Sequence, residues 1–358
     1  MKPAYLSYLA CPKCSGDLEI LEPAGVAEDL SIETGALRCT GCGATSPIRN
    51  RIPRFVDSTP YADSFGLQWL EFAKTQIDTE QTNESEVRFR TETGWSAESL
   101  KGCVVIEMGS GAGRFVDVVS KSGAKLAIGL DVTDAVDAAQ SNLGDRDNVL
   151  FIQGDIFAPP VKKEVCDVGY SIGVLHHTPD PQQGFKNMYD LVKPEGRFGV
   201  SLYEILLQRR PNRDNPVVSG KDVLWALNIF RSEVFRAITS RLPDRLFLAY
   251  CKTVVPILHH INKIPVIRYV RYLLPSTCYR NLPVSWSVLD TFDTYATSIV
   301  HRYRGKDVFR WFTALGARDA ILHNGRDGWV SVTGVKTSCE EREQRTISQE
   351  RPAGPGYL

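Results

Sequence analysis

Strands and helices alternate along residues 101–203, and this alternation constrains the fold more than any other feature of the chain. Short runs rich in Val, Ile and Leu predict buried strands, which lie at 104–107, 126–130, 149–152, 165–170 and 196–202. The segments between them predict helices at 114–121, 135–143 and 185–192. Strands that alternate with helices form βαβ units and a parallel sheet. The sequence therefore predicts an α/β fold.

A glycine-rich loop follows the first of these strands and opens the first helix. Its sequence is Glu107-Met-Gly109-Ser-Gly111-Ala-Gly113. Glycines let the backbone approach a ligand closely, and the N-terminus of the helix faces that ligand. A dehydrogenase would carry the spacing G-x-G-x-x-G to seat a pyrophosphate, whereas the spacing here is G-x-G-x-G. Glu107 would repel a pyrophosphate but would favour a ligand that carries a sulfonium and an ammonium group.

Two further acidic residues come at the ends of the next strands. Asp131 ends the second strand, where a carboxylate can accept hydrogen bonds from both hydroxyls of a ribose. Asp155 follows the third strand and could accept from an adenine amino group, with Ile156 packed on the ring. Each acid alone is more often a solvated loop residue. Three acids at successive strand ends favour a nucleoside ligand.

In this combination the residues resemble the class I S-adenosylmethionine-dependent methyltransferases. The glycine loop, Asp131, Asp155, the run 167–180 and the turn 192–197 match the motifs of that family in order. The resemblance covers about residues 100–203 and 300–337. Ser110, where many members have Cys, and Glu195, where Gly is usual, depart from the family pattern.

The resemblance implies a Rossmann-like, seven-stranded methyltransferase sheet whose last strand is reversed. A helix at 306–315 and a hairpin of strands at 320–323 and 329–335, with its turn at 324–328, fit that arrangement. S-adenosylmethionine is the implied cofactor. The implied cofactor-binding residues are Glu107, Gly109, Ser110, Gly111, Gly113, Asp131, Val132, Asp155, Ile156 and Ser171.

Four of the nine cysteines are paired near the N-terminus, as Cys11-Pro-Lys-Cys14 and Cys39-Thr-Gly-Cys42. Two residues between thiolates let one turn present both sulfurs to one ion, and two such turns complete a tetrahedral zinc site. A redox pair is the alternative, but it requires a thioredoxin-like context that Met1–Ile20 lacks. A site with four protein ligands has no open position, so we expect a structural zinc. Scattered cysteines elsewhere indicate a reducing, cytoplasmic protein.

The N-terminal unit and its exit Asn50-Arg-Ile-Pro-Arg-Phe55 resemble the small zinc-ribbon proteins that activate tRNA methyltransferases. The unit is less similar to the zinc ribbon fused to ribosomal RNA guanine methyltransferases. The whole layout also resembles ribbon-fused methyltransferases among glycan and natural-product tailoring enzymes. These resemblances leave RNA and small-molecule acceptors both open.

Two adjacent histidines, His176 and His177, leave the fourth strand beside the expected position of the transferred methyl group. An imidazole titrates near neutral pH, so either could act as the general base that removes a proton from an acceptor hydroxyl. Of the two we favour His177, because Thr178-Pro179 would hold it at the rim of the pocket. The alternative is a purely architectural role, since this run recurs in family members of different specificity.

Acceptor binding is expected from two segments that flank the core. Where the chain returns to the core, polar and aromatic residues gather, and such groups at the lid of a pocket suit the binding of an acceptor. A second group of residues, near residue 65, would form the opposite lid of the acceptor pocket. Together the expected substrate-binding residues are Gln68, Trp69, Asp290, Asp293, Tyr295 and His301. The alternative for both groups is capping and ordinary packing.

The formal net charge is zero, with 42 Lys+Arg against 42 Asp+Glu, which argues against a protein coated in nucleic acid. That total hides a basic segment, because residues 203–310 contain 17 Lys+Arg and 8 Asp+Glu, and residues 246–289 contain no acid. Three interpretations of this segment are open. It could be a solvated face with ordinary core helices, it could contact a membrane surface through residues 246–289, or it could bind an anionic acceptor. Prolines within it predict that it is divided into short helices.

Five segments follow from these patterns. They are a zinc ribbon at 1–57, a helical linker or lid at 58–100, a core at 101–203 and 290–340, a helical insertion capping the substrate at 204–289, and a disordered tail at 341–358. We expect a methyltransferase that acts on a hydroxyl of a small molecule or glycan. The alternative is an RNA base methyltransferase that grips RNA with its zinc ribbon.

Overall fold

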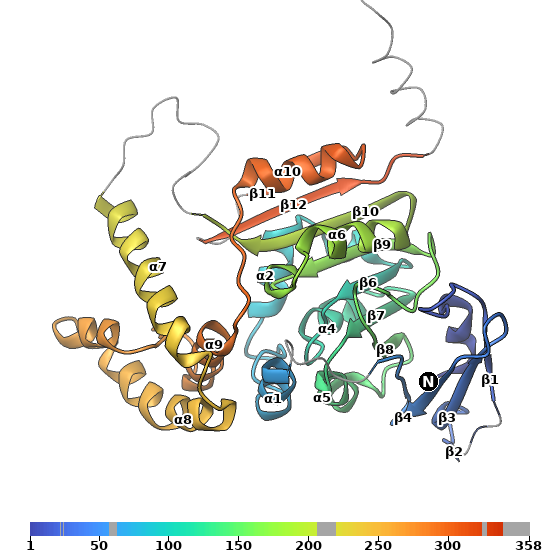
Figure 1. The fold of residues 1–358 in the computed structure, drawn as a ribbon, viewed down its shortest axis with the longest axis horizontal. Coiled ribbons are helices and arrows are strands. Elements are labelled where there is room, and N and C mark those ends of the chain that lie inside the picture. The colour runs from blue at the N-terminus through green and yellow to red at the C-terminus, as the bar shows by residue number, and fades with distance from the viewer. Residues whose placement is uncertain (22, 24, 57–62, 206–219, 324–327, 339–358) are drawn as a thin grey trace, which may run out of the picture.

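The computed structural model describes the chain except for residues 22, 24, 57–62, 206–219, 324–327 and 339–358. The expected tail and most of the expected hairpin turn lie outside the described residues. Figure 1 shows three parts in a row: the N-terminal unit at one end, a central sheet with its helices, and the helices of the insertion at the other end.

The central sheet has seven strands in the order β11-β12-β10-β9-β6-β7-β8. Strands β6 to β10 run parallel to one another, whereas β12 is antiparallel to both β10 and β11. The predicted seven-stranded α/β sheet with a reversed last strand is therefore confirmed. Its strands are β6 (Val104–Met108), β7 (Leu126–Asp131), β8 (Val149–Gln153), β9 (Cys166–Ile172), β10 (Val192–Tyr203), β11 (Arg318–His323) and β12 (Trp329–Val335).

Helices cover the sheet, and the side chains of the strands alternate between its two faces. On β6, Val104 and Ile106 belong to one apolar cluster and Val105 to another, as the two-residue period of a strand requires. The first cluster packs Phe185, from α6 (Pro181–Leu191), against Phe312, from α10 (Gly305–Ala314), with ring centroids 4.9 Å apart. The other helices of this part are α2 (Glu84–Thr93), α3 (Ala97–Leu100), α4 (Arg114–Lys121), α5 (Ala135–Leu143) and η2 (Leu175–His177).

An irregularity near the start of β10, where its pairing with β9 shifts register between Val192 and Arg197, explains one departure from the family pattern. Glu195 has φ of 65°, in the left-handed region that a glycine adopts most easily. Its backbone N–H donates to Lys336 O at 2.8 Å, and its side chain pairs with Arg318. These contacts hold a non-glycine residue in a conformation that costs roughly 1 kcal/mol.

A small antiparallel sheet forms the N-terminal unit. A short 3-10 helix, η1 (Pro3–Tyr8), precedes the strands. The strands are β1 (Leu18–Ile20), β2 (Gly25–Val26), β3 (Ile32–Cys39), β4 (Thr45–Arg49) and β5 (Ile52–Pro53). The unit docks along β8, the edge strand of the central sheet (Figure 1). Phe55 N donates to Gln153 O at 2.8 Å, and buried Arg54 pairs with Asp137 at 2.6 Å. Backbone pairing and an ion pair of the buried Arg54 thus join the unit to the core.

The insertion contains two long helices, so the prediction of short helices is wrong. They are α7 (Gly220–Thr239) and α8 (Asp244–Ile261), and η3 (Ile267–Leu273) follows them. Pro256 lies inside α8, although an interior proline costs about 3 kcal/mol. A separate apolar cluster offsets this cost, because α8 buries Phe247, Val255 and their neighbours against Phe292.

Phe292 belongs to α9 (Val284–Ala296), which packs with the helices of the insertion. The predicted core boundary at residue 290 therefore falls inside a helix of the insertion cluster. In addition, α1 (Asp63–Glu71) contacts both α5 and α9 and lies between the core and the insertion. In the described part of the chain, no helix has the length and apolar character needed to cross a membrane.

Candidate active site

A cavity of about 920 Å³ lies between the central sheet and the insertion. The glycine loop after β6, the residues after β7 and the residues after β9 line one side. Parts of α1, α7, η3 and α9 line the other side. The carboxyl ends of parallel strands are the usual ligand-binding edge of an open α/β sheet. The insertion therefore closes over the edge where a ligand of this fold is expected.

Backbone hydrogen bonds fix the glycine loop to the end of β7. Gly109 N and Ser110 N both donate to Leu130 O, at 2.7 and 3.0 Å. Gly109 has φ of 86°, and a Cβ at this position would lie 2.3 Å from Cγ1 of Val174. Only glycine fits there, because the conformation is left-handed and the space is filled.

Asp131 braces the same loop from the tip of β7. Its Oδ2 accepts from Gly111 N at 2.8 Å, and its Oδ1 accepts from the backbone and hydroxyl of Thr133 at 2.9 and 2.7 Å. Burial raises the pKa of this carboxyl group above its ordinary value. The loop and the carboxylate are thus preorganised before any ligand binds.

Glu107 and Ser110 place polar atoms at this end of the cavity. Burial raises the pKa of Glu107 well above its ordinary value, although Tyr170 donates to its Oε2 at 3.2 Å. The Ser110 hydroxyl is buried and has no hydrogen-bond partner among the described residues. A ligand with a positive charge beside Glu107 and a polar group beside Ser110 would satisfy both.

Most of the predicted cofactor residues line the cavity. Those that do are Glu107, Gly109, Ser110, Gly111, Asp131, Val132 and Ile156. Gly113, Asp155 and Ser171 are not among the lining residues. Asp155 accepts from Phe157 N at 2.8 Å, and the hydroxyl of Ser171 donates to Met108 O at 2.8 Å. The roles assigned to these three residues stay predictions without support from the cavity.

The two histidines differ in their surroundings. His177 lines the cavity, and its Nδ1 lies 2.9 Å from Ile299 O. Because a carbonyl oxygen only accepts, Nδ1 carries the proton, and Nε2 is left with its lone pair and without a partner among the described residues. Burial lowers the pKa of His177 to about 4. His176 does not line the cavity, and its ring packs against Tyr203 with centroids 3.9 Å apart.

The two segments expected to bind the acceptor meet across the cavity. Gln68 Nε2 donates to Asp293 Oδ1 at 3.2 Å, so α1 and α9 are joined at the cavity wall. Gln76 and Tyr279 donate to Asp290. Burial raises the pKa of both aspartates. Trp69 and Tyr295 also line the cavity, whereas His301 does not.

The sequence suggested that the basic segment could hold an anionic acceptor, but it did not single out the arginines that line the cavity wall. The arginines that line it are Arg88, Arg114, Arg231, Arg236, Arg271 and Arg302. Arg236 is 5% exposed; its Nε donates to Thr294 O at 3.0 Å and its Nη1 pairs with Glu233 at 2.6 Å. Its Nη2 is buried and has no partner among the described residues. A polar face of α7 formed by Asn228, Ser232 and Arg236 was the available signal.

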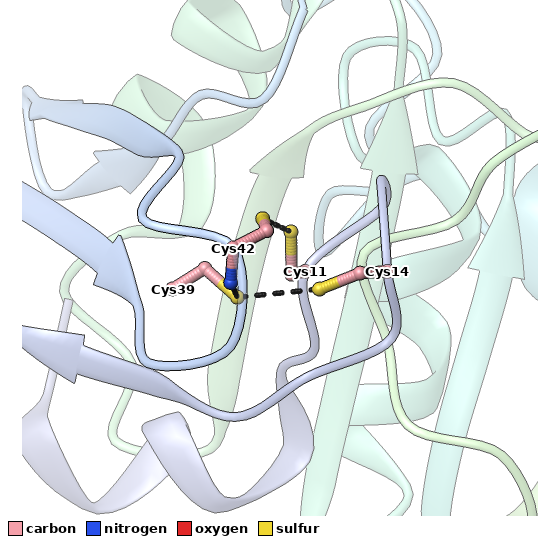
Figure 2. A group of neighbouring side chains, drawn as sticks. All are labelled: Cys11, Cys14, Cys39 and Cys42. Carbon is pink, nitrogen blue, oxygen red and sulfur yellow. Dashed lines mark hydrogen bonds between the residues drawn. The ribbon is translucent and has the colours of Figure 1, made fainter.

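The four paired cysteines form one cluster outside the cavity (Figure 2). All four Sγ atoms lie within 4.8 Å of one another, with Cys11–Cys42 at 3.7 Å and Cys14–Cys39 at 3.4 Å. Sulfurs of a tetrahedral zinc site are about 3.8 Å apart, as Zn–S bonds of about 2.3 Å require. The donor set and its spacing therefore fit one metal ion.

Comparison with known proteins identifies the region around the glycine loop as a methyltransferase domain. Residues 106–200 match the family described as a methyltransferase domain. The tRNA U34 carboxymethyltransferase of Ruthia magnifica subsp. Calyptogena magnifica is 32% identical over 114 residues, which are 31% of this chain and 36% of the relative. The ubiquinone biosynthesis O-methyltransferase of Coxiella burnetii (strain Dugway 5J108-111) is 30% identical over 105 residues, which are 29% of this chain and 44% of the relative. These matches support an S-adenosylmethionine-dependent methyltransferase domain.

The chain spans less than half the length of those two relatives. Among solved structures, the complex between the Haloferax volcanii Trm112 methyltransferase activator and the putative methyltransferase has a chain that overlaps with 78% of this one. The overlap covers 96% of that chain with 13% identity and a TM-score of 0.40. At that score no conclusion about this chain follows from the overlap.

Proposed function

We propose that the chain transfers a methyl group from S-adenosylmethionine to a hydroxyl of a small-molecule or glycan acceptor. The observation that carries the proposal is the cavity between the core and the insertion, with the glycine loop on one side and His177 on its wall. A cavity of this size, lined by both polar and aromatic groups, suits a small ligand.

The cofactor end of the cavity would be formed by the glycine loop, Glu107 and Asp131. S-adenosylmethionine supplies an already activated methyl group when it is bound. Asp131 can accept from ribose hydroxyls while its backbone contacts hold it in place. Glu107 supplies negative charge close to the cationic part of the ligand, and a nearby cation would favour its ionised form.

His177 is the residue we assign as general base. Its Nδ1–H donates to Ile299 O, which fixes the ring and leaves Nε2 as the atom that can take a proton. Because its pKa is about 4, the ring is neutral at physiological pH and free to accept. His176, packed against Tyr203 beneath it, is assigned a positioning role.

The arginines on the insertion side favour an acceptor with an anionic group. Arg236 has a buried, unpartnered Nη2 among the described residues, and Arg302 has a buried, unpartnered Nε. Glu233 contacts both guanidinium groups, at 2.6 and 3.4 Å, and so holds them close together. Two adjacent guanidinium groups with spare donors match the oxygens of a phosphate or carboxylate.

An RNA base acceptor is the second candidate, and the name of the tRNA-modifying relative favours it. RNA bound through many phosphates would be released steeply as salt rises. Retention of bulk tRNA or rRNA at physiological ionic strength would therefore replace the small-molecule proposal with this one.

We also propose that Cys11, Cys14, Cys39 and Cys42 hold a structural zinc ion. Four protein ligands leave no open position, and the cluster lies outside the cavity. The metal would therefore contribute to folding of the N-terminal unit and take no part in methyl transfer.

The cofactor assignment predicts that Asp131→Asn weakens binding of S-adenosylmethionine by about tenfold or more, since charge-assisted hydrogen bonds to the ribose are lost. Isothermal titration calorimetry measures the change. Asp134→Asn, a neighbouring and more exposed carboxylate, is the matched control and should bind normally. Equal affinity of the two variants would refute the placement, and no binding by folded wild-type protein would refute the proposed function.

The zinc proposal predicts about one zinc ion per chain in protein purified without chelator. Cys39→Ser should lose the metal and melt at a lower temperature, whereas Cys103→Ser, outside the cluster, should keep it. Metal analysis and thermal melting give both readings. A wild-type chain without zinc, yet with the N-terminal unit folded, would contradict the site.

The base assignment predicts that His177→Gln lowers kcat about 10²- to 10⁴-fold while affinity for S-adenosylmethionine is kept. In the wild type, kcat/KM should stay level as pH falls through 6.5 and drop only near pH 4, because His177 is protonated only there. His260→Gln, on the exposed side of α8, is the control. If kcat/KM of His177→Gln falls at low pH as it does in the wild type, the general base is Asp290 or Asp293 and not His177.

The anionic-acceptor assignment predicts that sugar nucleotides or simple phosphates raise the melting temperature of the wild-type chain. Arg236→Met should weaken that binding about 10- to 100-fold, because a buried charged donor is removed. Arg245→Met, exposed on α8, should leave it unchanged. Affinity for S-adenosylmethionine checks that the fold of Arg236→Met is intact. Equal responses of the two variants would exclude Arg236 from the acceptor site.

A further inference from the structure

Exposed apolar side chains are concentrated on one part of the molecule. Of the twenty large hydrophobic residues that are exposed in the described chain, fifteen lie between Leu227 and Leu274. Single exposed apolar residues are ordinary, but a concentration of this kind marks an interaction surface. The surface belongs to the insertion, at the end of the molecule opposite the N-terminal unit (Figure 1).

The outer face of α7 carries a continuous apolar stripe. Leu227, Phe230, Val234 and Ile238 are all exposed, and their spacing of three or four residues places them on one side of the helix. Ser232 and Arg236 are buried on the opposite side, toward the cavity. A helix that faced only water would carry polar residues on that outer face.

The segment around η3 continues this apolar surface. Val266 is 83% exposed and Leu273 is 74% exposed, and Ile267 and Val270 between them are exposed as well. Arg231, on α7, donates to Leu274 O at 3.0 Å, so η3 lies against α7. We call the outer stripe of α7 together with residues 264–274 the insertion face.

The segment that carries the insertion face is basic, and Glu233, the acid beside Val234 on α7, is paired with Arg236 and Arg302. No acidic residue occurs in residues 246–289. Exposed basic residues of the insertion are Arg241, Arg245, Lys263 and Arg280, together with Lys252, which pairs with Glu71. A combination of exposed aliphatic side chains and flanking cations is the pattern of a segment that lies in the interface of an anionic bilayer.

The cavity opens at the insertion face. Among the described residues that line the cavity, only Leu227, Tyr269 and Tyr272 are exposed, and all three belong to this face. The entrance is therefore bordered by apolar and aromatic side chains, with Arg271 between the two tyrosines. A molecule that entered from a lipid surface would meet these side chains first.

We propose that the insertion face docks on the surface of an anionic lipid bilayer, with the entrance of the cavity turned toward the lipid. A second copy of the chain fits the face less well, because two such faces in contact would bring their cations together. RNA fits it less well, because aliphatic side chains such as Val266 and Leu273 gain nothing against phosphates, whereas they gain free energy among acyl chains.

The test is co-sedimentation of the full-length protein with vesicles of phosphatidylcholine, with and without about one third phosphatidylglycerol. The double variant Val234→Glu/Leu273→Glu should bind the anionic vesicles at least about tenfold more weakly than the wild type. The reason is that two apolar side chains that would enter the bilayer are replaced by negatively charged ones. Val87→Glu/Leu30→Glu is the matched control: its two residues are 50% and 74% exposed, against 46% and 74% in the test variant. The control should bind as the wild type does.

The proposal is overturned if the wild-type protein does not bind anionic vesicles, whether or not it binds bulk tRNA. It is also overturned by equal binding of the test and control variants, or by a lipid-free dimer that only the test variant disrupts. Vesicle binding is measured without an acceptor, so its outcome is separate from that of the proposed methyl transfer.

Discussion

The end of β7 is the point on which the site depends. One carbonyl oxygen, that of Leu130, accepts from two successive N–H groups of the glycine loop, and the next residue, Asp131, accepts from a third. These bonds set the loop after β6 against the neighbouring strand, so the N-terminus of α4 and the carboxylate are presented together. Because β6 and β7 are buried parallel neighbours, the arrangement is as rigid as the sheet itself. The ligand edge is thus built before a ligand arrives.

Much of the fold could be predicted because local patterns and tertiary packing agree. The apolar runs of β6, β7 and β8 read as buried strands in the sequence and are buried strands in the structure. The two C-x2-C pairs likewise predict their own cluster, since short turns fix the direction of each thiol. In both cases the information lies within a few residues of the chain.

The arginines of the cavity wall and the long helices of the insertion could not be predicted in this way. Arg236 is one charge among many in a basic segment, and only the packing of α7 on α9 turns it inward. A proline usually interrupts a helix, but the burial of Val255 and Leu258 against α9 stabilises α8 around Pro256. Both features depend on contacts between residues far apart in the chain. The spacing of Asn228, Ser232 and Arg236 shows that α7 has a polar face, but it does not show what that face meets.

The position of the N-terminal unit has a consequence for solubility. The strand β8 is the last in its row, and an open row of backbone N–H and C=O groups is a template for pairing with another molecule. Phe55 N donates to Gln153 O at the end of β8. Residues 8–10 pair with residues 160–162, in the segment that follows β8. The N-terminal unit therefore covers the carboxyl end of this edge strand. A chain deprived of it would expose that edge and would be expected to self-associate, even if every residue of the cavity remained in place.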